Sequence, residues 1–145
     1  MRIVLGNDHR GIETKKKLIT ILEESGHEYN DLGTNSSEPV DYPDIARMVC
    51  KAVLNDGYDF GILVCDTGIG MSIAANKIKG IRAALCHDSF YAYRARLHND
   101  ANIMALGTRH SLDELREIVR SFLSTEFEGG RHNLRLEKIR KLEES

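Results

Sequence analysis

The stretch YDFGILVCDTGIGMSIAAN, residues 58–76, decides the fold of this chain. Its front half, residues 60–64, is a short apolar run with β-branched residues, which is typical of a strand buried on both faces. Its back half, residues 71–76, predicts the first turns of a packed helix. The connecting residues, CDTGIG at 65–70, place a thiol and two glycines at a helix N-terminus. Backbone N–H groups in such a loop bind anions and stabilise negative charge that develops during a reaction.

Strand and helix patterns alternate along the chain around this stretch. Strands are predicted at residues 2–6, 27–32, 60–64, 81–86 and 101–106, with helices between and after them. This alternation predicts an α/β fold, a five-stranded parallel sheet that is doubly wound (Rossmann or flavodoxin-like) and covered by helices on both faces. Ligands bind such sheets at the carboxyl ends of the strands. No repeat or linker interrupts the pattern, so we expect a single domain over residues 1–145.

Local signals predict some details of the helices. Ser111 and Glu114 form a capping box at the start of the last helix before the C-terminal segment. The lysines at residues 15–17 are expected to be largely solvated on the first helix. Residues 129–145 begin with two glycines and predict a charged helix with few apolar side chains. That helix could pack on its own domain or reach a partner subunit.

Composition excludes several classes of protein. A chain of 145 residues with 41% hydrophobic residues is long enough to bury a core. Its net charge of -2 gives no reason to expect nucleic acid or an anionic membrane as a partner. No apolar run is long enough to span a bilayer, and the N-terminal residues lack the pattern of a signal peptide.

The three cysteines, Cys50, Cys65 and Cys86, favour a reducing setting. Their number is odd and no C-x-x-C pair occurs, so neither a disulfide framework nor a structural zinc site is expected. A cytoplasmic location is the expectation that follows. Cys50 and Cys86 are interpreted as packing residues. Cys65 is the candidate reactive thiol, because a helix N-terminus lowers the pKa of a thiol.

Four groups of polar residues are expected to meet at the carboxyl edge of the sheet. These groups are Asp8-His9, the loop from Cys65 to Gly70, His98-Asn99-Asp100, and Arg109. A fifth group, Arg131, His132 and Arg135, opens the C-terminal helix, where residues 131 and 135 share a face and could clamp a phosphate. Taken singly, each group has an ordinary structural explanation, and only their convergence favours a site. The histidines are too scattered along the sequence to predict a metal site.

Taken together, these residues resemble the type B ribose-5-phosphate isomerases and the related galactose-6-phosphate isomerase subunits. The resemblance runs in order along nearly the whole chain. The matching stretches are GNDHRG at 6–11, DYPD at 41–44, CDTGIGMSIAANK at 65–77, HNDAN at 98–102, LG at 106–107, and GGRH with Arg135 at 129–135.

The resemblance implies an aldose–ketose isomerase that acts on a sugar phosphate without metal or cofactor. Such a reaction needs a base beside a weakly acidic C–H group and donors that stabilise an enediolate. In the family, the residue matching Cys65 moves the proton between C2 and C1, and the residue matching His98 opens the sugar ring. The other residues implied in catalysis or binding are Asp8, His9, Asp66, Thr67, Gly68, Ile69, Gly70, Asn99, Arg109, Arg131 and Arg135.

Roles within that set also follow from the resemblance. The backbone from Asp66 to Gly70 would hold the oxyanion, and the Thr67 hydroxyl would orient the thiolate or the substrate. Asp8 would act beside the ring-opening acid at the sugar hydroxyls, and Asn99 would bind the sugar. The remaining four residues would hold the phosphate and hydroxyl groups; they are His9, Arg109, Arg131 and Arg135.

The resemblance also implies a homodimer, with a pair of dimers left open. In the family, the residues matching His98, Asn99 and Arg109 come from the neighbouring subunit. One departure matters, because the family usually has Gly where this chain has Asp66. A carboxylate there opposes thiolate and enediolate charge, and positive φ would suit Asp less well than Gly. We therefore expect lower activity, or a different substrate choice, than with Gly.

Three alternatives stay open at this point. The substrate could be a six-carbon sugar phosphate, allose 6-phosphate or galactose 6-phosphate. A phosphoryl-signalling receiver shares the five-stranded architecture, with Asp66 as phosphoacceptor. A receiver has paired acids after the first strand and Lys after the fifth, whereas this chain has Asp8-His9 and Thr108-Arg109. A hydrolase that uses a Cys–His pair is the third alternative.

Overall fold

The computed structural model describes residues 1–145 and contains one five-stranded parallel sheet. The strands are β1 (Arg2–Asn7), β2 (Glu28–Asp31), β3 (Phe60–Val64), β4 (Ala83–Leu85) and β5 (Ile103–Leu106). Their order in the sheet is β2-β1-β3-β5-β4, so β3 lies at the centre. The predicted doubly wound fold is confirmed. The last two strands are exchanged relative to the flavodoxin-like order 2-1-3-4-5.

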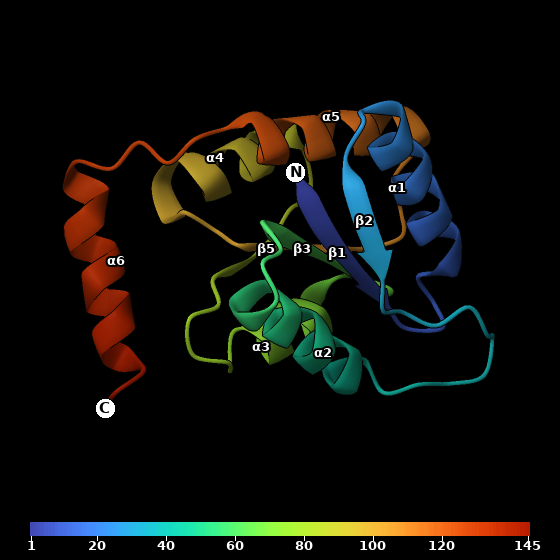
Figure 1. Ribbon diagram of the computed structural model, residues 1–145, viewed down its shortest axis with the longest axis horizontal. Coiled ribbons are helices and arrows are strands. Elements are labelled where there is room, and N and C mark those ends of the chain that lie inside the picture. Colours follow the sequence, from blue (N-terminus) through green and yellow to red (C-terminus); the bar gives the residue numbers. More distant parts are fainter.

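Helices cover both faces of the sheet (Figure 1). One face packs against α1 (Ile12–Glu24), α4 (Ser89–Asn99) and α5 (Leu112–Ser124), and the other against α2 (Tyr42–Asn55) and α3 (Ile69–Ala75). Side chains alternate along β3, where Ile62 and Val64 enter the first core and Leu63 enters the second. All three are at most 1% exposed, which explains the continuous apolar run in the sequence.

One half of the predicted capping box forms at the start of α5. The Ser111 hydroxyl accepts a hydrogen bond from the Glu114 N–H at 3.1 Å. The Glu114 side chain completes no reciprocal bond to the Ser111 backbone and instead lies 3.4 Å from His110 Nδ1. The capping box is therefore half formed, and the first turn of α5 is tied to the loop that follows β5.

One prediction about α1 is wrong. Lys15 is not solvated but 2% exposed. Its ammonium lies 2.9 Å from the Asp31 carboxylate and donates hydrogen bonds to Thr34 O and Asn35 Oδ1 at 2.8 and 2.7 Å. The lysine thus ties α1 to the end of β2 and to the loop that follows it. Only Lys16 keeps the expected exposed position, in an ion pair with Glu13.

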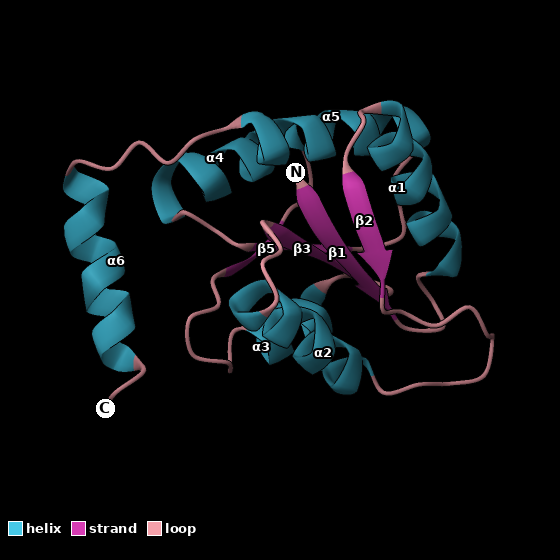
Figure 2. Cartoon of the chain, viewed as in Figure 1, coloured by secondary structure: helices cyan, strands magenta, loops and turns pink.

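The C-terminal helix α6 (Arg131–Leu142) stands apart from the sheet, beyond the end of α4 (Figures 1 and 2). His132 is its one buried residue. Leu134 and Leu142 are 63% and 71% exposed, so the apolar side of this helix is largely uncovered within the chain. Contact with a partner subunit remains a prediction for this helix. None of the helices has the length and apolar character that crossing a membrane requires.

Candidate active site

Cys65 directly follows β3, at the carboxyl edge of the sheet. Cys65 is 5% exposed, and its backbone N–H donates a hydrogen bond to Leu106 O at 3.3 Å. The next residue is pinned to the loop after β5, because Asp66 O accepts from both the N–H and the hydroxyl of Thr108, at 3.0 and 3.2 Å. Two neighbouring strands therefore fix the backbone that carries the thiol.

The loop after Cys65 turns through Gly68, which has φ +81° and precedes α3. A Cβ at this position would lie 2.6 Å from a Leu85 methyl carbon and 2.8 Å from the Leu106 carbonyl carbon, so only glycine fits without strain. Thr67 Oγ1 accepts from the Ile69 N–H at 3.2 Å. The backbone N–H groups at positions 66, 67, 68 and 70 find no acceptor within the chain. These four donors are unpaired within the chain, as in loops that bind anions.

The other two thiols, of Cys50 and Cys86, are expected to be less reactive. Burial raises the pKa of Cys50 to about 12. Burial, together with the Asp88 carboxylate, raises the pKa of Cys86 to about 12 as well. All three thiols are free. Cys65 is thus the one thiol that ends a strand beside unpaired backbone donors.

Asp8 and His9 follow β1 at the same edge. Asp8 is 7% exposed, and its Oδ1 accepts from the Arg10 N–H at 3.0 Å, which leaves Oδ2 without a donor in the chain. The Val40 N–H donates to His9 Nδ1 at 3.2 Å. A neutral His9 therefore carries its proton on Nε2, where it can be donated to a ligand. Both residues line a hollow of about 530 Å³, together with Val40, Asp41, Tyr42, Pro43 and Asp44.

Arg109 follows β5 at this edge, as the strand pattern predicts. Within one chain it therefore lies on the side of Cys65 and not with His98 and Asn99, with which the resemblance grouped it. It lines a second hollow, of about 330 Å³, with Asp66 and Thr67. Its guanidinium is exposed and has no hydrogen bond or ion pair within the chain. His87, Thr108 and His110 line the same hollow and were missed by the sequence analysis. The rule that ligands bind where parallel strands end could have found His87, because it follows β4.

His98 and Asn99 do not lie at this edge, so the predicted convergence within one chain is wrong. They end α4, which runs back from the end of β4 to the start of β5. The adjoining Asn102 bonds to groups near the starts of two strands. Its side chain donates to Gly80 O, which precedes β4, at 2.8 Å, and its carbonyl accepts from the N–H of Gly61, the second residue of β3, at 3.1 Å. In a parallel sheet this is the amino edge, opposite Cys65.

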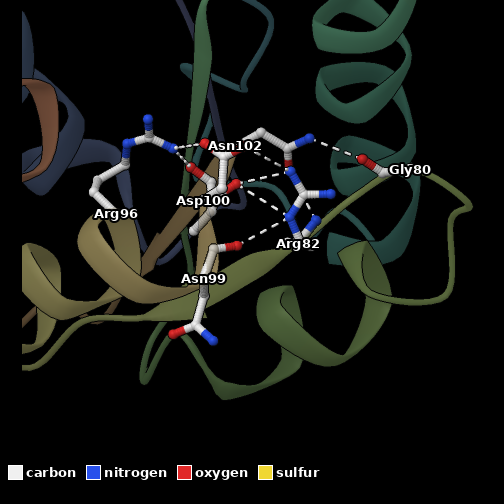
Figure 3. A network of polar contacts seen from close by, with 7 residues as sticks. Gly80, Arg82, Arg96, Asn99, Asp100 and Asn102 are labelled. Carbon is white, nitrogen blue, oxygen red and sulfur yellow. Dashed lines mark hydrogen bonds and ion pairs between the residues drawn. The ribbon is translucent and has the colours of Figure 1, made fainter. Parts of the chain in front are cut away.

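A polar network holds the turn that follows His98 (Figure 3). Asp100 adopts a left-handed conformation, with φ 45°, and its carboxylate accepts from Arg96 at 2.9 Å. Arg82 donates to the carbonyls of Asp100 and Asn99 at 2.9 and 3.0 Å. Arg96 also lies over the Phe60 ring, 4.6 Å from its centroid. Figure 3 shows the Asn99 amide pointing away from this network, so its hydrogen-bonding groups face outward.

His98 is stacked on His132, although the two are far apart in the sequence. Their ring centroids are 4.2 Å apart and their planes differ by 19°. Glu128 Oε2 lies 3.1 Å from His132 Nε2 and 3.8 Å from His98 Nε2. The histidines are thus less scattered than the sequence suggested. Arg94 Nη1 lies 3.2 Å from His98 Nε2, so a guanidinium and not a vacant position faces that nitrogen. The group is a hydrogen-bonded stack.

The charges around His98 have a definite effect on it. Partial burial lowers the pKa of the His98 imidazole, and His132 and Arg94 lower it further, while Glu128 opposes them. Arg131 adds a smaller lowering effect from the first turn of α6. Arg131 and Arg135 are both exposed and make no side-chain hydrogen bond or ion pair within the chain. This end of the molecule therefore offers free cationic groups beside a neutral imidazole.

Comparison with known proteins places these features in a family. A model of the ribose/galactose isomerase family matches residues 3–139. Ribose-5-phosphate isomerase B of Escherichia coli is 44% identical over 144 residues, which cover 99% of this chain and 97% of that protein. A putative sugar phosphate isomerase of Bacillus subtilis is 47% identical over 146 residues, covering 99% and 98%.

Solved structures agree with these sequence matches. Ribose-5-phosphate isomerase B of Clostridium thermocellum superposes with a TM-score of 0.96 at 48% identity, covering 99% of this chain and 98% of that chain. The Mycoplasma genitalium enzyme with bound ribulose-5-phosphate gives 0.92 at 40% identity, covering 99% and 97%. The fold and these matches define an isomerase of sugar phosphates. The chain belongs to the ribose/galactose isomerase family.

Proposed function

We propose that the chain interconverts ribose 5-phosphate and ribulose 5-phosphate through an enediolate. A relative found by sequence and a relative found by structure are both named ribose-5-phosphate isomerase B. The observation that carries the proposal is the position of Cys65, directly before four backbone N–H groups that have no acceptor in the chain. A base and a set of oxyanion donors are what proton transfer next to a carbonyl requires.

The chemistry assigned to these groups is a proton shuttle. The Cys65 thiolate takes the C2 proton of the open-chain aldose, and the electron pair moves to the carbonyl oxygen to give an enediolate. The proton of the C2 hydroxyl moves to the oxygen on C1, the thiol returns the carbon-bound proton to C1, and the C2 oxygen becomes the ketone. The loop N–H groups hold the oxygen that carries negative charge, and Thr67 orients the thiolate or the substrate. Asp8 and His9 contact the sugar hydroxyls from the same edge.

Ring opening is assigned to His98, which accepts the proton of the C1 hydroxyl and passes it to the ring oxygen. The C1 carbonyl forms as the bond between C1 and the ring oxygen breaks, so no atom or electron is gained or lost. Asn99 binds the sugar beside it. Arg109, Arg131 and Arg135 hold the phosphate and hydroxyl groups, as guanidinium groups without partners can.

We propose further that each site is completed by a second copy of the chain. Cys65 lies at the carboxyl edge of the sheet and His98 lies beside the amino edge of the same sheet. In the proposed assembly one subunit therefore supplies the thiol and its partner supplies the imidazole. The uncovered apolar side of α6 favours a subunit contact there, since Leu134 and Leu142 gain most by burial. A homodimer is the smallest such assembly. Three free thiols favour a cytoplasmic setting for it.

Proton NMR in deuterated water tests this function. Purified protein is mixed with ribose 5-phosphate, beside a matched Cys65→Ala variant. We expect ribulose 5-phosphate with the original protein only, with deuterium from the solvent in the product. Allose 6-phosphate and galactose 6-phosphate are run in parallel. Conversion of a six-carbon substrate with none of ribose 5-phosphate would contradict the proposed substrate. Equal conversion by the Cys65→Ala variant would contradict the role of the thiol.

A further inference from the structure

Charged groups from three parts of the chain face the His98 imidazole. Arg94 lies one turn earlier on α4, with Nη1 3.2 Å from His98 Nε2. Glu128 lies in the segment before α6, with Oε2 3.8 Å from the same nitrogen. His132 and Arg131 belong to the first turn of α6. Within one chain, these are the groups whose charges act on the ring.

The contact with Arg94 defines the form of the imidazole. Because a guanidinium only donates hydrogen bonds, His98 Nε2 must be the acceptor, which makes the ring neutral with its proton on Nδ1. Arg94 is itself held in place, since its guanidinium carbon lies over the Phe90 ring, 5.1 Å from the centroid. Arg94 therefore favours the neutral form of His98, and it must give up this hydrogen bond before Nε2 can take a proton from a substrate.

The contact with Glu128 has the opposite effect. Its carboxylate is 3.8 Å from His98 Nε2, near enough to stabilise a positive charge on that ring. Two bonds fix the glutamate: its N–H donates to Leu97 O at 3.0 Å, and its carboxylate lies 3.1 Å from His132 Nε2. His132 is 6% exposed and stacks on His98, so it holds the plane of the ring. Glu128 thus favours the protonated His98.

We propose that Arg94 and Glu128 are opposing positioning residues, the first holding His98 neutral before ring opening and the second stabilising the imidazolium formed during it. This inference rests on the proposed role of His98 in ring opening. When Nε2 takes the proton of the C1 hydroxyl, it can no longer accept from Arg94, and the two cations repel each other. The carboxylate of Glu128 compensates for that charge until the proton passes to the ring oxygen.

The directions of the electrostatic effects on His98 fit this arrangement. Burial, His132 and Arg94 lower the pKa of His98, and Glu128 raises it. A lowered pKa keeps the imidazole neutral near pH 7, and it makes the transient imidazolium a stronger acid toward the ring oxygen. Removing Arg94 and removing Glu128 should therefore shift the protonation of His98 in opposite directions, which a loss of packing would not do.

NMR titration of the whole protein, with labelled histidine rings, measures this directly. The His98 signal is assigned by its loss in a His98→Asn variant. Arg94→Gln should raise the pKa of His98, and Glu128→Gln should lower it, each by roughly half a unit or more. Arg94→Lys keeps the charge and should restore most of the original value. Arg120→Gln is the matched control, because it removes one exposed charge from α5 and should leave the pKa of His98 unchanged.

Kinetics then connect the titration to the reaction. With ribose 5-phosphate, kcat/KM falls on the acid side as His98 becomes protonated, so its acid limb should move to higher pH in Arg94→Gln and to lower pH in Glu128→Gln. Titrations that do not move, or that move in the same direction, would overturn the inference and leave the proposed function standing. Opposite titration shifts without any movement of the acid limb would show that His98 does not open the ring, which overturns both.

Discussion

Cys65 directly follows β3 at the carboxyl edge of the sheet, whereas His98 ends α4 beside the amino edge. The sheet itself separates the two residues within one chain. A reaction that needs both must therefore bring two chains together. In the proposed mechanism a ring is opened and a proton is moved, and the residues proposed for these two steps lie at opposite edges of the sheet.

Alkylation should single out Cys65. The pKa values of Cys50 and Cys86 are raised to about 12 by burial, so neither forms an appreciable thiolate near pH 8. Iodoacetamide at that pH should modify one thiol per chain, and peptide mass spectrometry should place the adduct on residue 65. Activity should fall in proportion to that adduct. Full activity in protein that carries one adduct on Cys65 would contradict its role as the base.

His98→Asn should affect the two directions of the reaction unequally. Ribose 5-phosphate is a ring and must be opened, whereas ribulose 5-phosphate cannot close a five-membered ring because its C5 oxygen is esterified. We expect turnover of ribose 5-phosphate to fall about 10²- to 10⁴-fold. Exchange of the C1 protons of ribulose 5-phosphate with solvent, followed by NMR, should fall far less. An equal loss in both assays would argue against a role confined to ring opening.

Asp66→Gly should raise activity or change the ratio of substrates used. Asp100 is the one non-glycine residue with positive φ, so Asp66 is not strained and the concern about its backbone conformation was unfounded. The remaining effect is its charge, which opposes the thiolate and the enediolate. Asp66→Asn should reproduce most of the gain, and added salt should narrow the difference, because the carboxylate is exposed. Unchanged turnover and substrate ratio in both variants would refute this effect.

Lys15→Met should destabilise the protein by about 2–4 kcal/mol, because it leaves the Asp31 carboxylate and two oxygen acceptors without their buried cation. Urea unfolding measures the change. Lys16→Met is the matched control on the same helix, and its exposed pair with Glu13 should be worth less than about 1 kcal/mol. Similar losses for both variants would show that burial of Lys15 does not matter for stability.

The fold could be predicted from the sequence because its signals are local. Apolar runs at residues 60–64 and 103–106, separated by helical patterns, predict a parallel sheet with both faces covered. Lys15 was wrongly predicted to be solvated because its partner, Asp31, lies in β2, a different element of the chain. A charged residue on a helix gives no local sign that it is buried. The order of the last two strands in the sheet, β5 before β4, likewise depends on packing between distant elements. Neither strand carries a sequence pattern that indicates this order.

Half of the candidate site could be predicted in the same way, from the rule that loops after parallel strands share one edge. That rule correctly grouped Asp8, Cys65 and Arg109. It was misapplied to His98, which precedes a strand and so lies at the other edge. The stack of His98 on His132 could not be foreseen, because it depends on how α6 returns to the end of α4.

The shared site can be tested most directly by mixing two inactive homodimers, Cys65→Ala and His98→Asn, under conditions that let subunits exchange. If each site takes its thiol from one chain and its imidazole from the other, every mixed dimer contains one intact site. Random exchange should then restore about a quarter of the original turnover of ribose 5-phosphate. Native mass spectrometry confirms that mixed dimers are present. Mixed dimers with no recovered activity would contradict a site built from two subunits.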